Sequence, residues 1–328
     1  MKRILLICPE FNGYEKIIEK ELSRNHYVKL ISYKEKDVFN LYGVHRYIYF
    51  ILTNLAKVTR SSILFRLRYF YALKRSNLID VVQSKLSKNE RYDQTIIIKG
   101  FGFRPENIKL IKERFSLDIR LYQWDSHGFY PGIEKLYTEC GKVFYFEKES
   151  KNNTIYLPNF WVKPIFKPKK TEDKRERVIY VGSFSFQRLF MLIAVRFKLR
   201  KHVQTLFSLY TQVRILRRLP FVTDKKISYN QLLSLYNDNK YVLELSNPGQ
   251  SGLTQRIFDA VNFNDIIIVT TQKHKVLLVD SGISGDVVIT IEDVHQGNMD
   301  ISLLSSKNEI EKFHFYEISH WINTILYS

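Results

Sequence analysis

The segment with the clearest chemical potential lies in the second half of the chain, between Ser246 and Ala260. It reads Ser-Asn-Pro-Gly-Gln-Ser-Gly-Leu-Thr-Gln-Arg-Ile-Phe-Asp-Ala and follows an apolar run that includes Glu244 and ends at Leu245. This pattern predicts a strand, a glycine-containing loop and a helix that begins near Gly252. The free N–H groups and the positive dipole end at a helix start bind anions. The segment therefore predicts a site for a phosphate or diphosphate.

Several side chains in this segment have types that suit such a site. Ser251 and Thr254 offer hydroxyl donors, and Arg256 offers a permanent charge that can hold a phosphate through two parallel hydrogen bonds. Asp259 lies further along the same expected helix, where its carboxylate could accept hydrogen bonds from ribose hydroxyls. The same residues also fit a structural role, with Ser-Gly-Leu-Thr as a helix cap and Arg256–Asp259 as an ion pair. The residues alone leave both interpretations open.

A second loop could face the same phosphate from the other side. The apolar run Val178–Val181 leads into Gly182-Ser183, and Arg188 follows shortly afterwards. Amide groups, hydroxyls and basic side chains aimed at a leaving diphosphate stabilise the negative charge that develops on it. We therefore expect Gly182, Ser183 and Arg188 to belong to the site.

Candidates for a general base lie in the first half of the chain. Asp125 and His127 follow the expected strand Asp118–Gln123, and Glu10 follows the expected strand Lys2–Cys8. A reaction that inverts a sugar carbon needs such a base, and histidine is basic near neutral pH. A retaining reaction does not require one, and the sequence leaves the stereochemistry open. No Cys/His spacing or Asp-any-Asp pattern indicates a metal site, so we expect neither a metal nor a cofactor.

The elements that must position these residues alternate between strand and helix, which indicates an α/β fold. We expect a Rossmann-like domain at residues 1–163 and a linker rich in proline and lysine at 164–177. A second Rossmann-like domain is expected at 178–306, and a C-terminal helix at 307–328. Residues 41–90 predict one or two basic helices, and a long helical region is expected after Ser185. The two cysteines, Cys8 and Cys140, fit buried structure in a reducing compartment.

The run Gln250–Asp259, followed by a strand that ends at Thr270, resembles the donor-site segment of GT-B glycosyltransferases. It is most similar to a bacterial group that makes lipopolysaccharide and capsular polysaccharide, related to the CgeB-like and group 1 families. The matching positions are Ser251, Gly252, Leu253, Thr254, Arg256, Asp259 and Ala260. Asp259 stands where the group usually has glutamate, so its carboxylate reaches one methylene less far. Supporting matches lie at 122–126, 143–149, 157–160 and 180–183.

The resemblance implies two Rossmann-like domains facing a central cleft, with the C-terminal helix returning towards the N-terminal domain. It also implies transfer of a sugar from a nucleotide-sugar, UDP- or GDP-linked, to a glycan or lipid-linked glycan of the cell surface. The donor contacts would come from Gly182, Ser183, Arg188, Glu244, Ser246, Ser251, Gly252, Leu253, Thr254, Arg256 and Asp259. An inactive GT-B-like partner subunit is one alternative. A nucleotide-sugar epimerase or dehydrogenase is disfavoured, because Pro9–Tyr14 lacks the glycine pattern of dinucleotide sites.

The formal net charge of +18 is unevenly distributed. No acidic residue occurs from Val38 to Ile79 or from Phe184 to Thr223, and both stretches mix basic residues with aliphatic and aromatic ones. Such surfaces attract anionic lipid, nucleic acid or anionic substrates. A nucleic-acid-binding protein is therefore an alternative, although no zinc-finger or helix-turn-helix pattern supports it. With no signal peptide and no long apolar run, we expect a cytoplasmic protein, peripheral on the inner face of the membrane.

Overall fold

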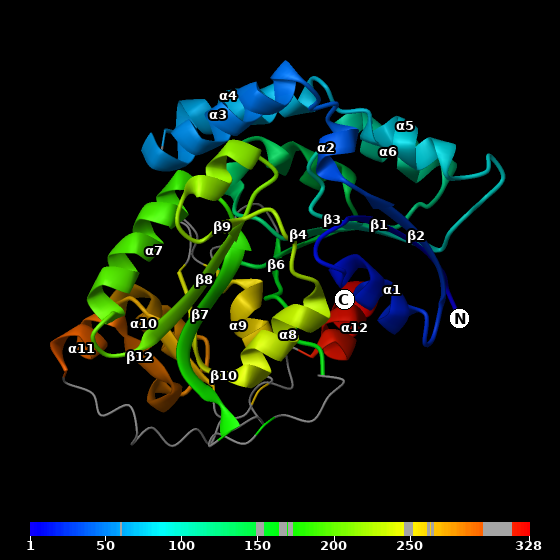
Figure 1. Cartoon of the computed structure of the whole chain (residues 1–328). Helices are drawn as coiled ribbons and strands as arrows, with labels where there is room; N and C mark the ends of the chain where they lie inside the picture. The colour runs from blue at the N-terminus through cyan, green and yellow to red at the C-terminus, as the bar shows by residue number, and fades with distance from the viewer. Residues whose placement is uncertain are drawn as a thin grey trace. The chain divides into compact units, whose positions relative to one another are not determined.

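The computed structural model describes residues 1–59, 61–148, 154–163, 169, 173–245, 252–260, 263, 266–297 and 317–328. The chain divides into two compact units. The first unit comprises Met1–Pro158, Pro248–Gly252 and Trp321–Ser328, and the second comprises Asn159–Asn247 and Leu253–His320. Each unit is built on one parallel sheet (Figure 1).

The first unit has a six-stranded sheet in its described part, with the order β2-β1-β3-β4-β5-β6. All neighbouring strands are parallel. Apolar runs with many isoleucine, leucine and valine residues form the central strands, as expected for a sheet that is buried on both faces. The strands are β1 (Arg3–Pro9), β2 (Tyr27–Tyr33), β3 (Gln94–Ile98), β4 (Ile119–Gln123), β5 (Lys142–Tyr145) and β6 (Ile155–Tyr156).

Helices cover both faces of this first sheet (Figure 1). Alternate residues point to opposite faces of a strand. Leu5, Ile97 and Leu121 belong to the core that packs under α2, α4, α5 and α6, while Tyr122 of β4 meets Trp321 of α12 edge to face. The helices are α1 (Tyr14–Leu22), α2 (Glu35–Val38), α3 (Val44–Thr59), α4 (Ser62–Leu73), α5 (Leu78–Ser84), α6 (Pro105–Arg114) and α12 (Ile318–Tyr327), with 3-10 turns η1 (His127–Phe129) and η2 (Ile133–Glu139).

The second unit has its own six-stranded parallel sheet in the described residues, with the order β12-β11-β10-β7-β8-β9. Counted along this unit, the order is that of the doubly wound Rossmann fold, and the direction of winding reverses between β7 and β10. The strands are β7 (Arg175–Ser183), β8 (Gln204–Tyr210), β9 (Val222–Thr223), β10 (Asn239–Leu243), β11 (Ile267–Thr270) and β12 (Val288–Thr290).

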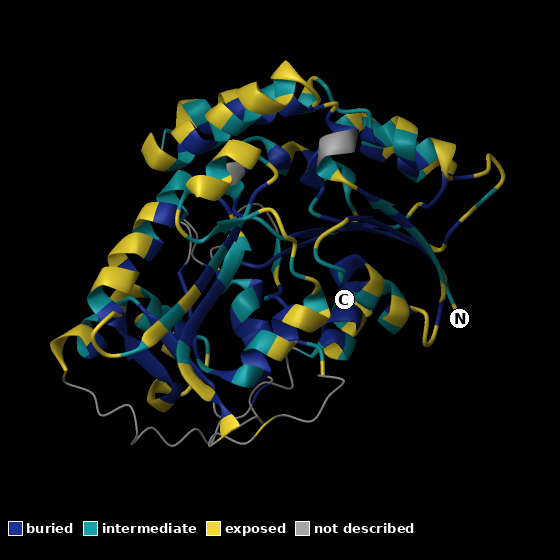
Figure 2. Cartoon of the chain, in the orientation of Figure 1, coloured by how far each residue is buried: buried dark blue, intermediate teal, exposed yellow. Residues whose placement is uncertain are grey.

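Helices again cover both faces. Ile179 and Val242 pack with Leu232 and Tyr236 of one helix layer, while Val178 and other residues of the opposite face lie with Leu199 and Val294. Figure 2 shows the central strands β1, β3 and β4 of the first unit as largely buried, whereas β7 and β8 of the second unit are only partly buried. The helices are α7 (Phe186–Leu199), α8 (Tyr229–Asp238), α9 (Gln255–Ala260), α10 (Gln272–Asp280) and α11 (Ile291–Gln296), with 3-10 turns η4 (Arg214–Arg218) and η5 (Gly285–Val287).

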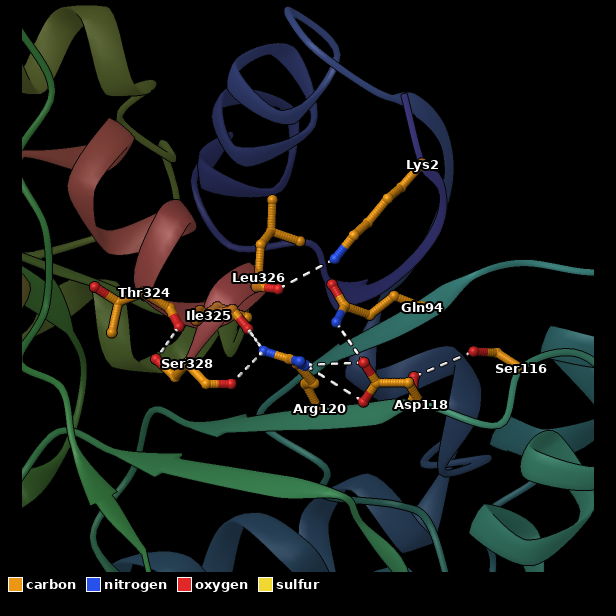
Figure 3. A network of polar contacts seen from close by, with 9 residues as sticks. All are labelled: Lys2, Gln94, Ser116, Asp118, Arg120, Thr324, Ile325, Leu326 and Ser328. Carbon is orange, nitrogen blue, oxygen red and sulfur yellow. Dashed lines mark hydrogen bonds and ion pairs between the residues drawn. The ribbon is translucent and has the colours of Figure 1, made fainter.

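The C-terminal residues complete the first unit. Trp321 is 1% exposed, and Arg120 of β4 donates a hydrogen bond from Nη1 to the carbonyl oxygen of Ile325. Arg120 is also ion-paired with Asp118 at 3.2 Å, and Lys2 Nζ donates to the carbonyl oxygen of Leu326 at 3.3 Å. Figure 3 shows this network around Arg120. Hydrogen bonds from two cationic side chains thus fix the end of the chain to β4 and to the residue before β1.

The predicted α/β class, with two Rossmann-like sheets and a C-terminal helix that packs against the first unit, is confirmed. Three details differ from prediction. Residues 41–90 contain α3, α4 and α5 rather than one or two helices, and the expected long helical region after Ser185 contains strand β8. Helix α9 begins at Gln255, three residues after Gly252. Within the described residues, no helix has both the length and the apolar character required to cross a membrane.

Candidate functional site

The candidate site of the second unit lies where β7 and β10 run side by side. The parallel register pairs Val178 with Tyr241 and Ile179 with Val242, so the residues that follow these pairs leave the sheet at the same edge. Ligands of doubly wound sheets bind outside the carboxyl ends of the strands at the point where the winding reverses. The end of β7 supplies Gly182 and Ser183, and Glu244 follows β10 directly. The fold therefore brings together two of the predicted segments.

A buried ion pair occupies this switch point. Arg256 Nη1 lies 2.8 Å from Glu244 Oε2, and the two side chains are 11% and 2% exposed. Arg256 Nη2 donates to the carbonyl oxygen of Val181 at 3.2 Å, and its guanidinium lies 4.2 Å from the ring centroid of Tyr180. Burial alone would lower the pKa of Arg256, but Tyr180 and Glu244 outweigh it and raise that pKa. The guanidinium is thus a fixed positive charge that joins β7 to Glu244.

Glu244 is the centre of further polar contacts. Thr254 donates from its hydroxyl to Glu244 Oε2 at 2.8 Å, and Thr270 donates to the backbone oxygen of Glu244 at 2.9 Å. Among the described residues, Glu244 Oε1, Arg256 Nε and the Tyr180 hydroxyl are buried polar atoms with no hydrogen-bond partner. Buried polar groups are nearly always satisfied, so unpaired ones require an explanation such as a ligand. The switch point thus retains hydrogen-bonding capacity for a polar ligand.

The loop after β7 is shaped by close packing. A Cβ on Gly182 would lie 3.1 Å from Tyr180 Cε1, so glycine keeps the backbone near the Tyr180 ring. Arg188, in the first turn of α7, donates from Nη1 to the carbonyl oxygen of Ser183 at 2.9 Å. Ser183 itself is exposed. The structure therefore places Gly182, Ser183 and Arg188 together.

The segment before α9 differs from prediction in its local structure. The expected helix start near Gly252 is wrong, because Leu253 and Thr254 precede the helix. Thr254 directs its hydroxyl to Glu244, and Asn159 Nδ2 donates to the carbonyl oxygen of Leu253 at 3.2 Å. These side-chain contacts fix the segment in a non-helical form. Ser246 and Ser251, which were also predicted to contact a nucleotide, lie outside the described residues.

Asp259 has different surroundings from Arg256. Its carboxylate accepts hydrogen bonds from Gln255 Nε2 at 3.2 Å and from the Tyr229 hydroxyl of α8 at 3.5 Å, and the residue is 1% exposed. Burial and the neighbouring Asp259 carboxylate raise the pKa of Tyr229. Asp259 thus lies towards α8, whereas Arg256 lies towards the ends of β7 and β10.

In the first unit, Asp125 belongs to a cluster of charges at the carboxyl end of β3. Lys99 Nζ lies 2.9 Å from Asp125 Oδ2 and 2.6 Å from Glu35 Oε1. Burial would lower the pKa of Lys99, but Asp125 and Glu35 raise it well above its usual value. Lys99 also has a positive φ of 71°, a conformation that is uncommon for residues other than glycine and costs conformational energy. The carboxyl edge of the first sheet, where the winding reverses between β1 and β3, therefore carries an ordered, charged site.

The other two candidate bases have separate surroundings. His127 Nε2 lies 2.5 Å from the Tyr137 hydroxyl, and the imidazole stacks on Tyr145 with ring centroids 4.1 Å apart. Glu10 lies in the loop after β1, with Oε2 3.9 Å from Lys34 Nζ. Asp125, His127 and Glu10 thus contact different side chains and share no common partner among the contacts described above.

Sequence reasoning missed several residues of these sites. Lys99 and Glu35 surround Asp125, Tyr180 stacks on Arg256, and buried Glu147 accepts from the Ser126 hydroxyl at 2.6 Å and from the amide of Gly252 at 3.4 Å. Lys99 could have been found from its position between a buried strand and two glycines. Glu147 and Tyr180 lie in stretches that resemble the GT-B group, 143–149 and 180–183, but the sequence did not single them out as site residues. No cluster of three or more His, Cys, Asp or Glu side chains suited to a metal occurs in the described residues.

The sequence matches no protein-family model, and a search of curated proteins finds no significant match. Solved structures are similar over nearly the whole chain. A UDP-forming α,α-trehalose-phosphate synthase from Burkholderia xenovorans shares 11% identity, with a TM-score of 0.58 over 99% of this chain and 98% of that one. A structure of such a synthase from the same organism with glucose-6-phosphate shares 9% identity, with a TM-score of 0.59 over 98% of each chain.

An α-glucosyltransferase in complex with UDP and a mismatched DNA is also similar. It shares 12% identity, with a TM-score of 0.54 over 98% of this chain and 94% of the other. Similarity of this kind, over the full length of both sheets, establishes the fold. The chain therefore has the GT-B fold that the sequence resemblance implied.

Proposed function

We propose that the chain is a glycosyltransferase that moves a sugar from a UDP- or GDP-linked donor to a glycan or lipid-linked glycan of the cell surface. The observation that carries this proposal is the Glu244–Arg256 pair at the switch point of the second sheet. It lies where a doubly wound sheet binds nucleotides, beside Gly182 and Ser183 and with unpaired polar atoms of Glu244, Arg256 and Tyr180.

In this proposal the second unit binds the donor. A ribose diol donates hydrogen bonds, and Glu244 Oε1 is a buried acceptor without a partner in the described residues. Glu244 therefore suits the ribose better than Asp259, whose carboxylate lies towards Tyr229. The exposed end of β7 at Ser183, with Arg188 behind it, suits the diphosphate. No metal or cofactor enters this proposal.

The first unit would then supply the acceptor side. Inverting transfer needs a base that removes the proton of the acceptor hydroxyl as the bond from the sugar to the diphosphate breaks. Asp125 is our first choice because it follows β4 at the carboxyl edge of the sheet and is held by Lys99 at 2.9 Å. His127 and Glu10 are the other candidates, and a retaining reaction would use none of them as a base.

The choice of donor is supported by the similar structures. The similar synthases are UDP-forming, and the similar glucosyltransferase holds UDP. The proposal of a bacterial cell-surface polysaccharide as acceptor rests on the resemblance of Gln250–Asp259 to that group of enzymes. UDP and its sugars are therefore the first ligands to test.

The test is a thermal-shift screen of the full chain against UDP, GDP, CMP and their common sugars. A nucleotide at one hundred times its Kd stabilises the native state by about 2.7 kcal/mol, which raises Tm. We expect one nucleotide to raise Tm and Glu244→Gln to abolish the shift. Glu176→Gln, at a 73% exposed side chain of the same unit, should bind as the native chain does.

The outcomes separate the proposal from its alternatives. Release of free nucleotide on addition of a glycan acceptor would establish transfer. Binding without turnover would instead indicate an inactive GT-B-like partner. No response to any nucleotide, together with salt-dependent binding of an oligonucleotide, would favour a nucleic-acid-binding protein.

A further inference from the structure

Helix α3 exposes its apolar side, which a helix of a globular unit normally buries. Its large apolar residues Val44, Tyr47, Ile48, Ile51, Leu55 and Val58 are between 37% and 64% exposed. Apart from Tyr47, which lies beside Ile48, they recur at intervals of three or four residues and therefore form one stripe along the helix. The buried residues of α3 are Asn54 and Ala56. An amphipathic helix normally turns its apolar stripe to the core, and this one turns it outward.

Helix α4, which packs beside α3, repeats the pattern. Ile63, Leu67 and Phe70 are 69%, 53% and 53% exposed and follow one another at intervals of four and three residues. The opposite face of α4 is well buried, with Phe65, Arg68, Tyr69 and Ala72. Figure 2 shows exposed residues along both helices. We call these exposed apolar residues of α3 and α4 the apolar face.

Basic residues lie on the same two helices as the apolar face, and Arg66 and Lys74 follow residues of its stripe on α4 by three and four positions. Arg46, Arg66 and Lys74 are exposed, and Lys57 and Arg75 are half-buried. The sequence has no aspartate or glutamate from Val38 to Ile79. Arg75 lies flat on Tyr71, with its guanidinium 3.9 Å from the ring centroid. The aliphatic residues and cations of these two helices are therefore accompanied by no acidic residue from the same stretch of sequence.

This combination of charges and side chains selects between possible occupants. A second copy would place the same acid-free cationic surface against itself, and like charges oppose such a contact. A nucleic acid would match the charge, but it is bound through phosphate contacts and base stacking, which rows of valine, isoleucine and leucine do not provide. A contiguous apolar patch on a soluble protein marks a binding surface. A lipid bilayer with negative headgroups above its hydrocarbon interior matches both the positive charge and the exposed apolar side chains.

We propose that α3 and α4 bind the surface of an anionic lipid bilayer, with the apolar face inserted among the headgroups and upper acyl chains. Arg66 and Lys74 contact the negative headgroups, and Arg46, on the other side of α3, adds to the positive charge of the helix pair. Both contributions are known for helices that lie in a membrane interface, where binding depends on buried apolar area and on anionic lipid. This proposal does not depend on the proposed glycosyl transfer.

The test is co-sedimentation of the full chain with vesicles of phosphatidylcholine alone or with 30% phosphatidylglycerol, a fraction chosen as roughly that of an anionic membrane. We expect binding to the anionic vesicles that weakens with salt. Ile51→Ser with Leu55→Ser and Leu67→Ser should lower the partition coefficient about tenfold or more, and so should Arg46→Glu with Arg66→Glu and Lys74→Glu. These side chains are exposed, so circular dichroism should show a folded protein.

Matched controls lie elsewhere on the first unit. Leu117 is 79% exposed outside these helices, and Lys16, Lys88 and Lys109 are exposed cations. Leu117→Ser and the triple change of these lysines to glutamate should leave vesicle binding within about twofold. Equal binding to neutral and anionic vesicles would overturn the proposal, as would equal losses in the control variants. A concentration-dependent dimer that the serine variants abolish, without vesicle binding, would show that a second copy covers the apolar face.

Discussion

Arg256 and Glu244 form an ion pair at 2.8 Å in which both side chains are nearly inaccessible to solvent. The pair joins α9 to the end of β10, and Arg256 extends it to β7 through the carbonyl oxygen of Val181. A charge that is removed from water remains favourable only while its partner is present. The arrangement at the switch point therefore depends on both residues together.

Removal of one partner should destabilise the second unit strongly. Arg256→Met leaves Glu244 as a buried, uncompensated charge, and we expect a loss of about 3–5 kcal/mol in the free energy of unfolding. Arg256→Met combined with Glu244→Leu should cost less than the sum of the two single changes. Urea denaturation measures these values. Asp224→Asn, which breaks the half-exposed pair with Arg217, should cost about 1 kcal/mol or less.

The pH dependence of stability should include a contribution from His274. Burial is the main cause that lowers the pKa of His274 below its usual 6.5. Glu244 raises this pKa, and Lys273 lowers it. Because the unfolded chain then binds a proton more readily than the native one, stability is lost as the pH falls through 6.5. We expect the native chain to lose stability relative to His274→Gln between pH 7.5 and about 5. A pH-independent difference would contradict this, and His202→Gln, at an exposed position, serves as the control.

Gly252 should not tolerate a side chain. A Cβ at this position would lie 2.6 and 2.7 Å from two ring atoms of Phe146, so Gly252→Ala should cost about 1–3 kcal/mol through overpacking. A Cβ on Gly128 meets nothing within 4 Å, and Gly128→Ala should be nearly neutral. Thermal unfolding compares the two variants. Similar midpoints would show that Phe146 and Gly252 are not in close contact.

Arg120 should hold the C-terminal helix in place. Arg120→Met removes the ion pair with Asp118 and the hydrogen bond to the carbonyl oxygen of Ile325, and hydrogen bonds to charged groups contribute about 1.5–3 kcal/mol. We expect faster amide hydrogen exchange in α12, with exchange in the second sheet unchanged. Arg91, whose guanidinium contacts are exposed, gives the matched variant Arg91→Met. Unchanged exchange in α12 would refute this role for Arg120.

The strands were predictable where their apolar runs are buried on both faces. The expected strand Lys2–Cys8 corresponds to β1 (Arg3–Pro9), and the expected strand Asp118–Gln123 corresponds to β4 (Ile119–Gln123). Strand β8 was missed because it lies on the half-exposed side of the sheet, where only Phe207 and Leu209 of its seven residues are buried. Its neighbours Arg196–Lys201 and Arg214–Arg218 are rich in cations and resemble helix surfaces. The position of β8 in the sheet therefore determined that it forms a strand, and its local sequence pattern did not predict this.

The sequence predicted which segments form the candidate site, but it did not predict which side chains contact one another there. The sequence marked Arg256 as a phosphate ligand, whereas the structure gives it Glu244 and Tyr180 as partners. The start of α9 was placed too early because Ser-Gly-Leu-Thr resembles a cap, and the hydroxyl of Thr254 is instead bonded to Glu244. Contacts between residues far apart in sequence, such as Lys99 with Glu35, leave no local pattern.

The return of Trp321–Ser328 to the first unit affects how the protein must be made. A ribosome releases β1 to β6 long before these residues, so the nascent first sheet waits with one side of Tyr122 uncovered while the second unit is synthesised. Newly made chains would then expose the apolar surface around Tyr122 to chaperones during that interval. Breakdown products cut within the second unit would expose the same surface and be prone to aggregate.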